Sequence, residues 1–261
     1  MQNNLSNDQI AILKLLCSSQ KESIALAEQL AVSQNIDLVS FLQSIGYDKL
    51  GLATADNFMS QELTLTDDNL AYWSEYLPQN VSNLWVRNYS KPTLPAHLPP
   101  NLIFLNCSNN QIVSLPDNLP NSLVFLHCYN NKIEHLPDNL PPNLQKLYCS
   151  TNLLTKLPDN LPDNLIFLNC NVNQIISLPD NLPQNLKILF CHDNHIISLM
   201  NNFPPNLQAL HCSNNRLTNL PDHLPKSLRF LDCSDNQIKT LPKYLLDRGV
   251  QINHEGNPIK Q

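Results

Sequence analysis

Apolar and polar positions repeat in a frame of 21 residues that runs seven times without a slip. In the first complete turn the frame places leucine at Leu102 and Leu105, cysteine at Cys107, asparagine at Asn110 and isoleucine at Ile112. A strict period in the range of about 20–29 residues indicates stacked structural repeats. The chain is therefore predicted to form a solenoid in which each turn buries its apolar side chains against the next.

Within one turn, the segment before the cysteine alternates in polarity. Leu105 and Cys107 are predicted to point inward, and Phe104 and Asn106 outward, which is the period of a short strand. Turns stacked in register pair these strands into one parallel sheet, with about 4.8 Å between neighbours. The chain returns to the next strand through about a dozen residues that contain two prolines. Fixed φ values and missing donors favour an extended, polyproline-type return over a helix.

The repeated cysteines and asparagines have side chains that often serve in functional sites, but here the fold alone accounts for both. Free cysteine behaves as a small apolar residue, so the strand pattern predicts buried, reduced thiols and a reducing compartment. Each asparagine is predicted to satisfy backbone groups at the bend after a strand, within its own turn and toward its neighbours. The cysteine column is Cys107, Cys128, Cys149, Cys170, Cys191, Cys212 and Cys233. The asparagine column is Asn110, Asn131, Asn152, Asn173, Asn194, Asn215 and Asn236.

Three pairs of adjacent histidine and cysteine suggest metal ligation, as at His127-Cys128, but neighbours on a strand face opposite sides. Zinc spacings such as C-x₂-C are absent from the sequence, so neither a metal site nor a cofactor is predicted. The sequence also shows no nucleophile–base pair, phosphate loop or carboxylate constellation. These observations argue against an enzyme, and no catalytic residue is assigned.

A break in composition divides the chain near residue 77. All 20 prolines lie at or after Pro78, and the first 77 residues carry 10 acidic and 3 basic residues in a chain of net charge −6. Helical periodicity before the break predicts a helical N-terminal region or cap over 1–76. The repeat domain is predicted over 77–261, with seven regular turns and degenerate first and last turns, and thus nine strands. Whether residues 1–50 dock on the stack or form a separate bundle stays open.

The repeat resembles the LPX class of bacterial leucine-rich repeats found in the YopM and IpaH effectors. The resemblance covers about residues 77–259 and rests on the proline-containing return, the short period and a closing Gly-Asn-Pro, as in Leu136-Pro137, Leu140-Pro141 and Gly256-Asn257-Pro258. It implies an α/β solenoid: a right-handed leucine-rich-repeat superhelix with one parallel sheet and extended polyproline-type convex returns, capped by N-terminal α-helices. Nothing in the chain matches the ubiquitin-ligase domain that follows the repeats in IpaH-like members.

The residues that point outward from the strands vary from turn to turn, whereas the inward columns do not. A broad aromatic patch is typical of a partner surface, although stacked rings can also simply support one another across strands. The predicted partner-binding residues on this concave face are Trp85, Phe104, Phe125, His127, Tyr129, Tyr148, Phe167, Phe190, His192, His211, Phe230 and Asp232.

By the resemblance, the chain is expected to be a non-catalytic protein-interaction module, a bacterial effector that binds a host protein. The alternative is a recognition or scaffold subunit of a ubiquitin-ligase or kinase complex assembled in trans. The resemblance implies delivery into the host cytoplasm by a bacterial secretion system, with the bacterial cytoplasm as the alternative. The sequence shows neither a Sec signal peptide nor a membrane-spanning segment. Nucleic acid is not expected as a partner, because the candidate recognition helix at 35–44 has no Lys or Arg. The sequence does not indicate the oligomeric state.

Overall fold

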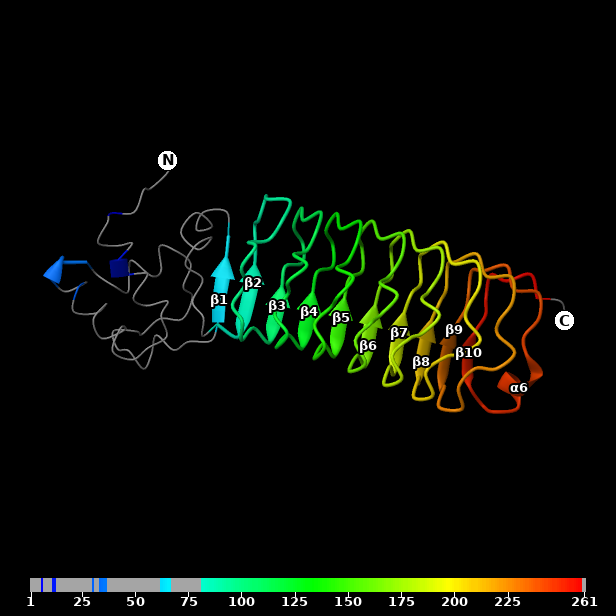
Figure 1. Ribbon diagram of the computed structural model, residues 1–261. Helices are drawn as coiled ribbons and strands as arrows, with labels where there is room; N and C mark the ends of the chain where they lie inside the picture. The colour runs from blue at the N-terminus through cyan, green and yellow to red at the C-terminus, as the bar shows by residue number, and fades with distance from the viewer. Residues whose placement is uncertain are drawn as a thin grey trace.

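The computed structural model describes residues 6, 11–12, 30, 33–36, 62–66 and 81–259. These residues contain one parallel sheet whose ten strands follow one another in chain order (Figure 1). The strands are β1 (Glu62–Leu65), β2 (Asn83–Val86), β3 (Phe104–Asn106), β4 (Phe125–His127), β5 (Lys146–Tyr148), β6 (Phe167–Asn169), β7 (Ile188–Phe190), β8 (Ala209–His211), β9 (Phe230–Asp232) and β10 (Gln251–Asn253). The predicted solenoid of stacked parallel strands is confirmed.

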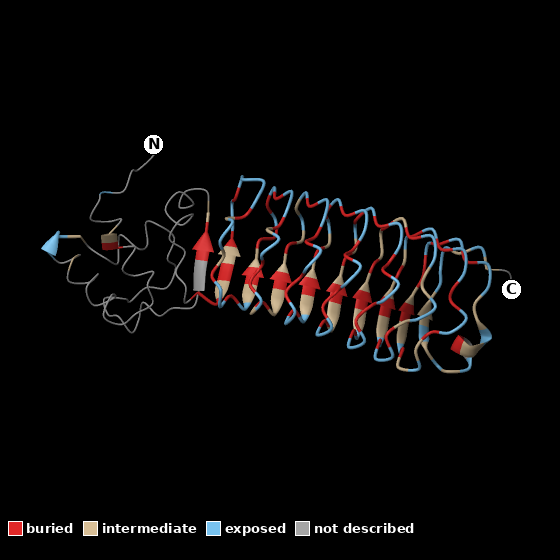
Figure 2. Cartoon of the chain, viewed as in Figure 1, coloured by how far each residue is buried: buried red, intermediate tan, exposed pale blue. Residues whose placement is uncertain are grey.

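Each strand pairs with the next at a constant offset of one turn, so that Leu105 lies opposite Leu84 on one side and Leu126 on the other. The middle residue of each strand from β3 to β9 is buried, and its two neighbours are half-buried. Figure 2 shows this alternation along the sheet. The strand period of two residues therefore separates a core side from a concave side, as the sequence predicts.

The core is one continuous cluster between the sheet and the returns. Each turn contributes the two leucines before the cysteine, the cysteine itself and the aliphatic residue two positions after the asparagine, for example Leu165, Leu168, Cys170 and Ile175. All four are inaccessible to solvent. Because each turn adds the same residues in register, the core extends along the whole described stack rather than closing around a centre.

Apart from isolated parallel bridges that join Thr93, Ser114 and His135, the described returns carry no strand or helix until the four-residue helix α6 (Lys243–Leu246). Pro242, immediately before α6, has φ −59° and ψ 126°, within the polyproline region. The second proline of a return accepts a hydrogen bond from the leucine three residues later, as Leu165 N donates to Pro162 O at 3.0 Å. Each return of this kind therefore ends in a tight turn that feeds the next strand. The last return differs from the predicted extended form, because it contains the helix α6.

A left-handed residue recurs two positions after each cysteine of the column, and after Val86, which takes the place of cysteine in the turn of β2. The repeat pattern did not predict this feature. The φ values are positive at Asn88, Asn109, Asn130, Thr151, Val172, Asp193, Asn214 and Asp235. Asparagine and aspartate tolerate this conformation, so they can take the role that glycine has in many bends. Thr151 and Val172 are β-branched and are strained there, at a cost of about 1–2 kcal/mol each.

The sheet begins one turn earlier than the sequence predicts. Strand β1 lies inside the region predicted to be helical, and its Leu63 pairs with Leu84 in the same register as the later turns. The helical prediction is therefore wrong at 62–65, and there are ten strands instead of nine. The strand was missed because its turn has neither the prolines nor the asparagine of the regular frame. Apart from short stretches, the rest of the predicted helical region lies outside the described residues.

Candidate partner-binding face

Aromatic rings form an unbroken path across the concave side, from β2 to β9. Consecutive ring centroids lie 4.3–5.5 Å apart along Trp85, Phe104, His127, Tyr148, Phe167, Phe190, His211 and Phe230. The path does not follow a single position of the repeat. Some of its rings belong to the first residue of a strand and others to the third. Every turn between these two ends contributes one ring, so the path is a continuous surface feature and not a set of isolated side chains.

The rings of the path are half-buried, although their side chains point outward from the sheet. Each ring covers part of its neighbours, since parallel strands bring equivalent side chains within contact distance. Packing among the rings therefore contributes to folding, by about 0.2–1 kcal/mol per cross-strand pair. The remaining exposed edges and faces are what a partner could contact.

The other predicted residues of this face lie beside the path. Phe125 lies under the ammonium group of Lys146, at 5.7 Å from Nζ to the ring centroid. Tyr129 and His192 lie at the rim, with their rings 6.4 Å from His127 and 6.3 Å from Phe190 respectively. These residues widen the aromatic surface toward the ends of the strands.

Asp232 has a local structural contact that the sequence did not suggest. Its Oδ1 accepts hydrogen bonds from the Ser234 amide at 3.1 Å and from the Ser234 hydroxyl at 2.7 Å. Asn106 holds the bend after β3 in the same way through Ser108. Part of the hydrogen-bonding capacity of Asp232 is thus used within its own turn.

Two histidines of the path are held toward their neutral form. Burial lowers the pKa of His127, and the nearby Lys146 lowers it further. Burial also lowers the pKa of His211, with His192 acting in the same direction and Asp232 opposing it. Near pH 7 the ring path therefore carries little charge, and the surface is suited to apolar and hydrogen-bonding contacts more than to ionic ones.

The core side of the same strands confirms the predicted cysteine column. All seven described cysteines are free and buried. Burial raises the pKa of Cys107 and of Cys170 to about 12. The thiols of Cys149 and Cys170 each donate to the carbonyl opposite them in the next turn, at 3.4 Å. The column packs as predicted and is turned away from the concave face.

The asparagine column also works as predicted. The Asn173 side-chain amide donates to the carbonyls of Cys170 and Asn171 in its own turn and to that of Cys149 in the preceding turn, at 3.0–3.1 Å. Its Oδ1 accepts from the Leu154 amide at 3.0 Å. Each such asparagine therefore ties two turns together at the bend.

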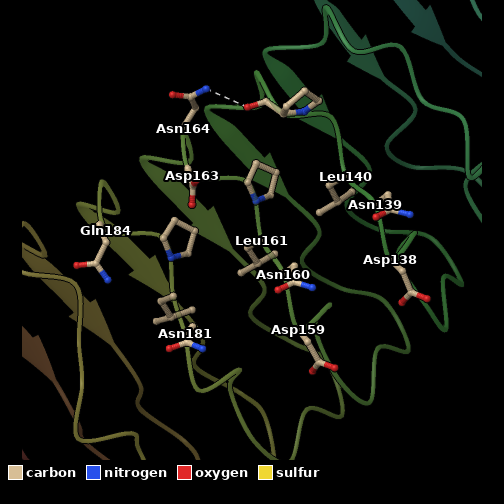
Figure 3. A pocket seen from close by; sticks show the side chains of 14 residues that line it. Asp138, Asn139, Leu140, Asp159, Asn160, Leu161, Asp163, Asn164, Asn181 and Gln184 are labelled. Atoms are coloured by element: carbon tan, nitrogen blue, oxygen red, sulfur yellow. Dashed lines mark hydrogen bonds between the residues drawn. The ribbon is translucent and has the colours of Figure 1, made fainter.

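A hollow lies on the return side of the solenoid, with a cavity volume of about 610 Å³. In Figure 3, Asp138 and Asp159 lie on one side of the leucine floor, and Asp163 and Asn164 lie on the other. The same return sequence lines it in three consecutive turns, so its shape follows from the repeat itself. Nothing beyond its carboxylates and amides indicates a ligand, and the concave face remains the stronger candidate.

One group of surface residues was not predicted from the sequence, and it lies on the segments that follow β5, β6 and β7. Leu153, Val172, Ile176 and Ile197 are exposed there, with Ile176 at 59% and Ile197 at 60%. The sequence does hold a sign of this group. The residue two positions after the cysteine position is Asn or Asp in six of eight turns, and Thr151 and Val172 are the exceptions. Among the described residues, no group of three His, Cys, Asp or Glu side chains could hold a metal ion, and no helix is long and apolar enough to cross a membrane.

Comparison with known proteins agrees with this architecture. A family model described as "Leucine Rich repeats (2 copies)" matches residues 205–245. The leucine-rich-repeat domain of a Shigella effector is 30% identical, over 69% of this chain and 80% of that one, with a TM-score of 0.52. No curated protein matches the sequence significantly.

Two further structures are similar to the chain. YopM from Yersinia enterocolitica is 32% identical over 71% of this chain, with a TM-score of 0.47, and the chain spans only 48% of that protein's length. The functional domain of InlJ from Listeria monocytogenes, which includes a cysteine ladder, is 20% identical over 85% of this chain and 61% of that one, with a TM-score of 0.60. The likeness to InlJ concerns the fold alone.

Proposed function

Because the chain belongs to the leucine-rich-repeat family, with a Shigella effector domain among its relatives, we propose that it is a non-catalytic protein-binding module that acts as a bacterial effector on a host protein. The concave face is the proposed binding surface. The unbroken ring path carries this proposal, because it offers eight rings in contact on one side of the sheet. Leucine-rich-repeat solenoids are typically binding scaffolds, and delivery into the host cytoplasm belongs to the same proposal.

The ring path is suited to protein partners for a physical reason. Tyrosine, tryptophan and phenylalanine supply large contact areas with few rotatable bonds, so little conformational entropy is lost when they are covered. Packing against neighbours already restrains these rings in the free protein, for example Phe190 against His211 at 4.3 Å between centroids. A partner would therefore meet a pre-ordered surface.

Identifying the partner and then removing the rings tests the proposal. Proximity labelling in a host cell would identify candidates, and the affinity of the purified chain for each would then be measured. Tyr148→Ala, Phe167→Ala and Phe190→Ala are each expected to weaken binding by about 30-fold or more at a hot spot. Asn202→Ala and Lys226→Ala, on the exposed returns, serve as controls that leave affinity unchanged.

Circular dichroism and urea unfolding of each variant would separate binding from folding. Normal affinity in all three folded ring variants would contradict the proposal. Recovery of ubiquitin-conjugating or kinase components as the direct partner would instead favour the subunit alternative, in which the chain presents a substrate to an enzyme supplied in trans.

A further inference from the structure

Three unusual features occur together on the rim formed by segments 150–156, 171–177 and 192–198, which follow β5, β6 and β7. The first is backbone strain. At the left-handed position most turns use Asn or Asp, but two consecutive turns use Thr151 and Val172. Val172 is also 43% exposed, so burial does not compensate for its strained conformation. Strain of this kind collects at functional sites, where a side chain serves a purpose other than stability.

The second feature is exposed apolar surface. Leu153, Val172, Ile176 and Ile197 lie in three consecutive turns, and each is at least 40% exposed. The amide of Ile197 donates to the carbonyl of Ile176 at 3.4 Å, so these two exposed isoleucines stand on neighbouring turns. The positions equivalent to Ile176 in the turns on either side of this pair are Thr155 and Thr218, which shows that the fold accepts a polar residue there.

The third feature is a pair of polar atoms without partners. In the described residues, Asn171 Oδ1 and His192 Nδ1 are the two buried side-chain nitrogen or oxygen atoms that make no hydrogen bond. They belong to side chains that meet each other, with 2.5 Å between Asn171 Nδ2 and His192 Nε2. Buried polar atoms are rarely left unpaired, and an exception indicates strain or an absent partner.

Charge around this rim selects the kind of partner. The exposed cations Lys132, Lys156 and Arg216 lie on the rim or on the turns beside it. The acids nearby are Glu134, which is exposed, and Asp117 and Asp138, which line one hollow together with Lys156. Asp193 accepts a hydrogen bond from the Asn214 side-chain amide, and its Oδ2 lies 3.8 Å from His192 Nε2. An apolar patch with a basic fringe complements a segment that carries apolar side chains between carboxylates.

From these features we infer that the rim of β5–β7 is a second docking surface, distinct from the ring path, which binds an acidic, amphipathic segment of a partner protein. Ile176, Ile197 and Val172 provide the apolar contact, and Lys156 and Arg216 attract the flanking carboxylates. The inference does not depend on the proposed use of the concave face.

Selection of a phage-displayed library of random peptides on the purified full chain tests this inference. Peptides that combine Asp or Glu with large apolar residues are expected to be enriched. Synthetic copies should lose at least about tenfold in affinity for the double variant Ile176→Thr/Ile197→Thr and for Lys156→Glu/Arg216→Glu. Val113→Thr is the matched control, because Val113 is an exposed apolar residue at the equivalent position of a distant turn.

The variant Val172→Asn is expected to change stability and peptide affinity in opposite directions. Asparagine accepts the left-handed conformation, so the folding equilibrium constant should rise by about tenfold while peptide affinity falls. Phe167→Ala/Phe190→Ala should leave the peptides bound, which separates this surface from the ring path. A library without acidic amphipathic binders, unchanged affinity in Ile176→Thr/Ile197→Thr, or a Val172→Asn chain that is no more stable would overturn the inference.

Discussion

The two sides of strand β6 differ in how much their residues vary from turn to turn. Leu168 and the following Cys170 face the core, and the equivalent residues are leucine and cysteine in every regular turn. Phe167 and Asn169 face the concave side, where equivalent positions range from lysine to alanine and from tryptophan to aspartate. The core side is fixed because each turn must fit the turn before it. The concave side shares only ring contacts between neighbours, so its composition is available for recognition.

The largest expected contrast between the two sides is chemical reactivity. Thiolate is the reactive form of cysteine, and a pKa of about 12 at Cys170 leaves roughly one thiol in ten thousand ionised at pH 8. The seven thiols of the column should therefore resist alkylation in the folded chain and react completely after unfolding. Mass spectrometry after iodoacetamide treatment, with and without urea, measures this difference.

Cys17 lies outside the column and outside the described residues, so the experiment is done on Cys17→Ser. Diethyl pyrocarbonate labelling of the half-buried His127 and His211 in the same sample serves as the concave-side control. Rapid native labelling of the central Cys149 or Cys170 would show that the inner side is open.

The next contrast concerns packing in a single strand. Leu168→Ala removes a side chain with no solvent exposure and should lower the free energy of unfolding by about 2–5 kcal/mol. Phe167→Ala, one residue earlier, removes a half-buried ring and its two ring contacts, and should cost clearly less. Urea unfolding of both variants measures the difference. Equal losses would mean that the ring path is as much a part of the core as the leucines are.

A smaller contrast compares two asparagines two residues apart. Asn173→Ala leaves the Leu154 amide and three carbonyls without their side-chain partner, and should cost about 1–3 kcal/mol. Asn171→Ala removes a side chain whose oxygen is already unpaired, and its cost should be a few tenths of a kcal/mol. Thermal unfolding monitored by circular dichroism ranks the two. A larger loss of stability for Asn171→Ala than for Asn173→Ala would contradict the proposal that Asn173 joins neighbouring turns.

The sequence predicts the core side well because one residue type repeats there at a fixed spacing. The cysteine column, the asparagine ladder and the register of β3–β9 all follow from that period. It predicts less at the ends of the stack and at bends. Strand β1 lacks the prolines and asparagine that mark the other turns, and the left-handed position depends on a backbone angle that Asn, Asp, Thr and Val here share.

The candidate site is predictable in its residues but not in its surroundings. Alternation along β4 places His127 on the concave side, yet it does not reveal that the ring lies 4.3 Å from Tyr148 and 5.1 Å from Phe104. Those contacts depend on side-chain rotamers, which a polarity pattern does not contain. The rim of β5–β7 was missed for a related reason: exposed isoleucine is conspicuous only when the exposure of each position is known.

The smallest expected contrast is the pH dependence of stability. The histidines of the concave side should contribute to it, and the thiols of the core side should not. The pKa of His127 and of His211 is lowered in the folded chain, mainly by burial, so the unfolded chain binds more protons below its ordinary histidine pKa of about 6.5. Their contribution to stability is therefore complete above about pH 6.5 and is lost as the pH falls through the folded-state values. The buried thiols stay protonated throughout this window and contribute no slope.

Urea midpoints at about pH 7.5 and about pH 5.5 measure this effect, with His127→Gln/His211→Gln as the comparison. The wild-type midpoint should fall more than that of the double variant, because glutamine does not titrate and the other ionisable groups are common to both chains. Lys146 beside His127, and Asp232 and His192 beside His211, are retained so that the local charges stay the same. An equal fall in both chains would show that the two rings are as well hydrated in the folded chain as in the unfolded one, and that the concave side behaves as ordinary surface.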